Sequence, residues 1–144
     1  MKITYPVIFT EVDTNILIEV PDLGILTEAN SEDEPKGSIA DAIMMARDAI
    51  GISCIEREDK KEEIAEPSSL TEIDISKGAF YAEGIGIVSL VDVDLVRYRR
   101  MLDCKTVRRN VTLPNWLNQE AERAKINVSK VLQEALMAKL GVYR

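Results

Sequence analysis

The sequence predicts an α+β protein in which a β-β-β-α-β module precedes a strand-helix-helix module. Short β-type runs and one long helical stripe fill the first two thirds of the 144 residues, and two further helical stripes follow an alternating run near the C-terminus. The charge also reverses. Residues 1–95 hold 7 Lys and Arg against 21 Asp and Glu, a net charge of −14, whereas residues 96–144 hold 11 against 4, a net charge of +7. This reversal indicates two modules with different partners.

Three short strands are predicted at the N-terminus. Residues 3–10 and 16–20 are rich in β-branched and aromatic side chains, and a third run covers residues 25–27. Turn-forming residues separate these runs, which therefore predict an antiparallel meander. Pro6 lies inside the first run, so we expect that strand at a sheet edge or bulged at this point.

One long helix is predicted after a polar loop at residues 31–37. Ser38 is a candidate N-cap, and Asp41 follows three residues later, as in a capping box. The helix should run to about Glu58, although Gly51 weakens it by about 1 kcal/mol relative to Ala. Apolar residues at helical spacing form a stripe that can pack on the sheet: Ile39, Ala42, Ile43, Ala46, Ala49 and Ile50.

A fourth strand is predicted at residues 85–93. This apolar run lacks clean alternation, so we expect it to be buried on both faces of the sheet. The first module then spans residues 1–94. Residues 95–104 contain three arginines and are expected to form a basic linker to the second module, residues 105–144.

The second module is predicted to begin with a strand whose two faces differ. Val111 and Leu113 share the apolar face, and the polar face carries Arg108, Asn110 and Thr112. Pro114 suits the first turn of a helix. Asn127 is a candidate N-cap for a second helix, which should end before Gly141. The helical stripes are Leu117, Ala121 and Ala124, and then Val128, Val131, Leu132, Ala135, Leu136 and Leu140.

Such a module is expected to be an obligate homodimer. One strand alone leaves both hydrogen-bonding edges open, and two helices cannot cover Leu113 together with their own apolar stripes. Pairing the strand with its copy from a second chain satisfies the backbone and closes a four-helix core. The sequence leaves a higher oligomer open.

Composition excludes several classes of chemistry. The chain has no His, which removes histidine acid–base catalysis, Ser-His-Asp triads and imidazole metal sites. Cys54 and Cys104 are far apart in the sequence and indicate neither a zinc site nor a disulfide framework. We expect no catalytic residues, no metal and no cofactor. The sequence shows no signal peptide, and its longest apolar run is far shorter than the roughly 20 residues of a membrane span. We therefore expect a cytoplasmic protein that does not contact the membrane.

Residues 105–142 resemble a ribbon-helix-helix DNA-binding domain. The resemblance rests on the alternating strand that ends in Leu-Pro, the amphipathic first helix, and the Asn-x-Ser start of the second helix. It implies that the paired strands enter the major groove of operator double-stranded DNA and read base edges through Arg108, Asn110 and Thr112. Their chemistry fits, because Arg pairs with guanine, Asn with adenine, and Thr with either edge.

The same resemblance implies a phosphate anchor at the start of the second helix, with free backbone N–H groups and a positive helix dipole. By position the anchor comprises Asn127, Val128, Ser129 and Lys130. A strand-helix-helix tail that dimerises without binding DNA remains the alternative.

The N-terminal module resembles the HicB family of antitoxins. Tyr5-Pro6 in the first strand, the VPDLG turn after the second strand and the Ala-rich helix beginning at Ile39 carry the resemblance, in the order seen in that family. It implies a partial RNase-H-like domain that binds and masks a small basic HicA-type toxin, an mRNA-cleaving protein. The ribbon-helix-helix tail would then repress the operon. The hairpin at residues 13–15 lacks the Gly often found in the family, and the loop at 29–37 is longer and more acidic.

Two other functions stay open at this point. One is a stand-alone ribbon-helix-helix transcription regulator whose N-terminal domain senses a ligand. The other is a metal-dependent nuclease, which needs three or four converging carboxylates. The candidate carboxylates, by residue type only, are Asp13, Glu19, Asp22 and Glu28.

Overall fold

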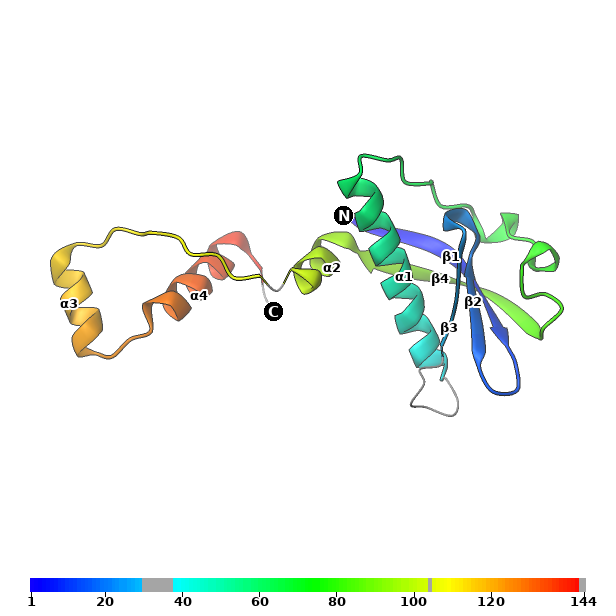
Figure 1. Cartoon of the computed structure of the whole chain (residues 1–144), viewed down its shortest axis with the longest axis horizontal. Coiled ribbons are helices and arrows are strands. Elements are labelled where there is room, and N and C mark those ends of the chain that lie inside the picture. The colour runs from blue at the N-terminus through cyan, green and yellow to red at the C-terminus, as the bar shows by residue number, and fades with distance from the viewer. Residues whose placement is uncertain (30–37, 104, 143–144) are drawn as a thin grey trace. The chain divides into compact units, whose positions relative to one another are not determined.

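The computed structural model describes residues 1–29, 38–103 and 105–142, and the chain divides into two compact units, Met1–Cys104 and Lys105–Arg144 (Figure 1). The expected polar loop at 31–37, most of the acidic 29–37 segment and Cys104 lie outside the described residues. The protein is of mixed α+β type. The first unit contains strands β1 (Lys2–Glu11), β2 (Ile16–Val20), β3 (Ile25–Glu28) and β4 (Ile85–Asp94), with helices α1 (Ile39–Asp59) and α2 (Leu95–Leu102).

The four strands form one antiparallel sheet in the order β3-β2-β1-β4. The predicted β-β-β-α-β order is confirmed, and the predicted strand runs agree with the observed strands to within two residues. Ser38 caps α1 with the predicted reciprocal bonds to Asp41, which satisfies a free N–H group at the helix start.

Helix α1 covers one face of the sheet and packs Ala42, Ile43, Ala46 and Ile50 of the predicted stripe against it, whereas Ile39 at the start of the stripe is 59% exposed (Figure 1). Burying a large apolar side chain contributes roughly 1.5–3 kcal/mol, so this contact stabilises the unit. The core joins sheet and helix through Tyr5, Val7, Phe9, Ile18, Val20, Val91, Ala42, Ala46, Ile50 and Cys54. Burial raises the pKa of Tyr5 to about 12, and the Tyr5 hydroxyl donates to the carbonyl oxygen of Ala65.

Pro6 does not place β1 at the edge of the sheet, because β1 is an inner strand. The Leu95 N–H donates to the Met1 carbonyl at 3.0 Å, and this bond sets which residues of β1 turn their backbone groups toward β4. Because bonded and non-bonded pairs alternate along an antiparallel ladder, the odd residues of β1 bond to β4 and the even residues face β2. Pro6 is an even residue, so its nitrogen points away from β4 and toward the β2 side. The β1–β2 register covers only Ile8 to Glu11, so the missing N–H of Pro6 removes no ladder bond.

The expected burial of the fourth strand on both faces is wrong. Strand β4 is an edge strand, and only Val91 and Val93 of its residues are buried. Ile85 is 79% exposed, Ile87 63% and Leu90 51%. An apolar run alone does not reveal this outcome, because the burial of a strand's side chains depends on which elements pack on each face of the sheet.

Residues 95–102, expected as part of a basic linker, form helix α2 and pack on α1. Leu95 is buried, and the Asp94 side chain caps the helix by accepting from the Arg97 N–H. The Tyr98 ring lies so close to Gly51 that a Cβ there would come within 2.7 Å of the Tyr98 Cδ1. The first unit therefore extends beyond residue 94, and the glycine inside α1 makes room for this contact.

The second unit contains helices α3 (Asn115–Arg123) and α4 (Val128–Leu140), as predicted from the two stripes. Asn127 caps α4, and Gly141 ends it in the left-handed conformation with φ 67°. Among the described residues, no helix has both the length and the apolar character needed to span a bilayer.

Candidate functional site

In a single chain, residues 105–142 of the second unit contain no buried side chain. Neither α3 nor α4 contains a buried residue. Leu113, which ends the predicted strand, is 41% exposed, and Leu136 in the middle of α4 is 52% exposed. The other exposed large apolar residues of this unit are Val107, Val111, Trp116, Leu117, Ile126, Val128, Val131, Leu132 and Leu140. A stripe of this extent needs a partner surface to cover it.

The predicted base readers lie together on the segment that precedes α3. Arg108, Asn110 and Thr112 are exposed. Residues 105–114 form neither helix nor strand in the single chain, in contrast to the predicted strand. The difference has a physical reason, because a strand is defined by ladder hydrogen bonds and this segment has no neighbouring strand in one chain.

The start of α4 has the geometry of an anion site. The Asn127 side chain accepts from the Lys130 N–H at 3.2 Å. The N–H groups of Val128 and Ser129 precede it in the first turn, where a helix has no internal acceptors. Lys130 and Ser129 are exposed. The four predicted anchor residues are thus consecutive at a helix N-terminus, where the dipole favours negative charge.

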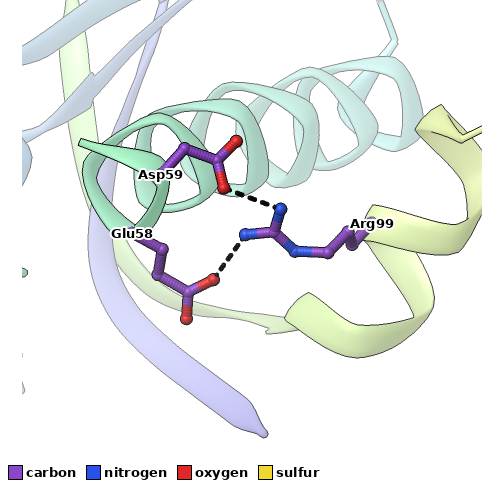
Figure 2. Close-up of polar contacts among 3 residues, drawn as sticks. All are labelled: Glu58, Asp59 and Arg99. Atoms are coloured by element: carbon purple, nitrogen blue, oxygen red, sulfur yellow. Dashed lines mark hydrogen bonds and ion pairs between the residues drawn. The ribbon is translucent and has the colours of Figure 1, made fainter. Parts of the chain in front are cut away.

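One of the three arginines at the charge reversal has a structural role. Arg99 donates to Glu58 and to Asp59, both at 2.8 Å, and so joins α2 to the end of α1 (Figure 2). The hydrogen bond that Arg99 donates to Glu58, and then the one that it donates to Asp59, raise the pKa of Arg99. Tyr98 also donates to Asp48 at 3.1 Å. Sequence reasoning missed the contacts of Arg99 and Tyr98, because their partners are 40 to 50 residues away in the sequence.

Three of the four acidic residues considered for a nuclease site have other contacts. Glu19 accepts from the Ala79 N–H at 3.0 Å, and Glu28 accepts from the Asn15 amide at 3.0 Å. Asp22 accepts from both the N–H and the hydroxyl of Ser68. Asp13 is exposed. In the part of the chain that the structure describes, no three Cys, Asp or Glu side chains gather as a metal site.

Comparison with known proteins gives a likeness in fold. Neither a protein-family model nor a curated protein matches the sequence. A chain of a solved structure, a toxin–antitoxin complex from Streptococcus pneumoniae, matches with a TM-score of 0.59 and 20% identity. The match covers 96% of this chain and 99% of that chain. At this identity the likeness establishes a shared fold.

Proposed function

We propose that the protein is the antitoxin of a type II toxin–antitoxin system. Its first unit binds and masks a HicA-type mRNA-cleaving toxin. Its second unit dimerises as a ribbon-helix-helix domain and represses the operon by binding operator DNA. The observation that carries the proposal is the second unit, whose apolar stripes are exposed in one chain while basic and polar residues alternate before α3. The fold likeness over nearly the whole chain supports the proposal.

Dimerisation follows from the exposed stripes. Pairing residues 105–113 with the same segment of a second chain supplies the missing ladder bonds, and the four helices then cover each other's apolar residues. In the resulting ribbon, alternate side chains point to opposite faces. Val111 and Leu113 turn toward the helices, and Arg108, Asn110 and Thr112 turn outward.

DNA binding follows from the outward face. A two-stranded ribbon fits the major groove, where Arg108 can donate two bonds to guanine and Asn110 can pair with adenine. The N-terminus of α4, with the Val128 and Ser129 N–H groups and the Lys130 ammonium, holds a backbone phosphate. These contacts fix the ribbon in the groove, and the ribbon residues select the sequence.

Toxin binding rests on charge and on the resemblance to HicB proteins. A net charge of −14 over residues 1–95 suits a basic RNA-binding partner and speeds its association. Masking needs no reacting group in this chain, which we propose is not an enzyme.

A pair of neighbouring arginines tests the DNA-binding part. Arg108→Ala and Arg109→Ala remove the same charge, but the two residues lie on opposite faces of the proposed ribbon. Binding to operator and to scrambled duplex is measured by fluorescence anisotropy. We expect Arg108→Ala to cost about 1–3 kcal/mol on the operator and to reduce discrimination. Arg109→Ala should weaken both duplexes equally. Equal loss of discrimination in the two variants would remove the base-reading role.

Co-expression tests the toxin-binding part. The full chain should restore growth to cells that express a HicA-type toxin from the same genome, and the two proteins should co-purify in fixed ratio. A chain that represses the operon yet fails to bind the toxin would instead support a stand-alone regulator. RNA cleavage by the purified chain alone, with Mg²⁺ present, would contradict the masking mechanism.

A further inference from the structure

No strand in the described part of the chain pairs with the outer edge of β4, and apolar side chains lie along that edge. The bond from the Leu95 N–H to the Met1 carbonyl fixes the ladder, so the odd residues of β4 bond to β1 and the even residues face outward. A second bond agrees, because Arg47 Nε donates to the carbonyl oxygen of Asp92 from outside the sheet at 3.2 Å. Gly86, Val88 and Leu90 therefore direct their N–H and C=O groups away from β1.

This edge is protected at one end only. Edge strands usually carry charges, prolines or bulges that prevent pairing. Arg47 covers β4 at Asp92, where the two side chains also form an ion pair at 3.0 Å. Residues 85–91 contain no charged residue and no proline. The unprotected stretch coincides with the exposed side chains of Ile85, Ile87 and Leu90.

We propose that the β4 edge pairs with β4 of a second copy of this chain, antiparallel about a two-fold axis at Val88. In this register, the outward-facing N–H and C=O groups of Gly86, Val88 and Leu90 all find partners, and the pairing stops before Asp92, which Arg47 contacts. Val88 pairs with its own copy, and Gly86 pairs with Leu90 in both directions. The eight strands of the two copies then form one continuous sheet.

The side chains fit the same register. On one face, Ile87 lies opposite Ser89 of the second copy, so a large residue meets a small one. On the other face, Leu90 lies opposite Gly86, and the half-buried Ile75 side chain lies over that glycine. The exposed leucine therefore gains an apolar neighbour. This interface is separate from the dimer proposed for the second unit and does not depend on it.

Disulfide cross-linking of the full chain tests the register. In a Cys104→Ser background the remaining native thiol is Cys54, which is buried. We expect Val88→Cys to form a covalent dimer under mild oxidation, because directly opposed residues have Cα atoms about 5.5 Å apart, within the range of a disulfide. Dimer is measured by intact mass and non-reducing electrophoresis.

Ile85→Cys is the matched control. Ile85 is the more exposed residue, yet the register places it opposite Val91, so two copies of residue 85 lie about 20 Å apart along the strands. We expect no covalent dimer from this variant. Equal cross-linking at residues 85 and 88 would indicate random collision, and no cross-linking at residue 88 would overturn the register.

Sedimentation of the full chain gives a second readout. Ile87→Lys places a charge in each copy of the proposed edge, and the sedimentation coefficient should fall, because the paired edges separate whichever state the second unit sets. Ile52→Lys, on an exposed position of α1, should leave the sedimentation coefficient unchanged. Because each N-terminal segment carries −14, added salt should strengthen the wild-type association. An unchanged sedimentation coefficient for Ile87→Lys would overturn the proposal. Loss of toxin binding in that variant would indicate that the β4 edge contacts the toxin instead.

Discussion

At the residue scale, Gly51 shows how a local cost supports a tertiary contact. A glycine within a helix costs about 1 kcal/mol relative to alanine. Here the missing side chain lets the Tyr98 ring lie against the α1 backbone, where a Cβ would come within 2.7 Å of Cδ1 and 3.0 Å of Cγ. Both atoms belong to the ring of a side chain whose hydroxyl donates to Asp48, so the ring cannot move aside without losing that bond. Burial, and then this bond, raise the pKa of Tyr98 to about 12.

A double-mutant cycle tests this explanation. Gly51→Ala should lower the free energy of unfolding in the wild-type chain, because the new methyl group overlaps the ring. In a Tyr98→Ala chain the same change should raise it, by up to about 1 kcal/mol, because only helix propensity then remains. Urea unfolding of the wild type, the two single variants and the double variant gives the sign of each change in the free energy of unfolding. Stabilisation by Gly51→Ala in both backgrounds would show that the ring moves freely.

At the element scale, the residue types at the two ends of α4 set its length, and its apolar stripe is exposed in one chain. Asn127 at the N-cap and Gly141 after the last turn were both predicted from residue type, since an N-cap needs a short acceptor and a left-handed residue favours glycine. The stripe between them is exposed. Local chemistry therefore sets where this helix begins and ends, and the proposed pairing with a second chain would cover its apolar face.

The phosphate anchor on α4 can be tested with two lysines of one helix. Lys130 lies in the first turn and Lys139 in the last turn. We expect Lys130→Ala to weaken binding to all duplexes about equally and to lower the salt slope by about one unit, because one phosphate contact is lost. Lys139→Ala should have little effect on either quantity. Anisotropy titrations at several salt concentrations measure both, and a sequence-selective loss for Lys130→Ala would contradict a backbone contact.

At the scale of the whole molecule, the limit of the first unit lies after α2. A fragment of residues 1–104 should fold by itself, since it contains the sheet, both helices and the core. A fragment that ends at residue 94 loses the buried Leu95 and the Tyr98 contact, and its free energy of unfolding should be lower by about 2–5 kcal/mol. Thermal and urea unfolding compare the two fragments.

Arg99→Ala within the 1–104 fragment is the control for that comparison. Its ion pairs with Glu58 and Asp59 are exposed to solvent, and exposed pairs contribute little. The free energy of unfolding of this variant should therefore be close to that of the unchanged 1–104 fragment. An equal free energy of unfolding for the 1–94 and 1–104 fragments would instead indicate that residues 95–104 act only as a linker.

The sequence by itself determined the type and order of the elements in the first unit. Strand runs, the Ser38 cap and the helical stripes depend on neighbours a few residues away, so residue types alone specify them. Tertiary structure decided the rest. Whether the side chains of an apolar run such as β4 are buried depends on what packs on each face of the sheet, and whether Pro6 disrupts a sheet depends on where β2 pairs with β1. Whether Arg99 is a free charge or a partner of Glu58 depends on residues forty positions apart meeting in space. The strand expected at residues 105–113 needs a neighbouring strand, because its hydrogen-bonding groups point sideways out of the chain.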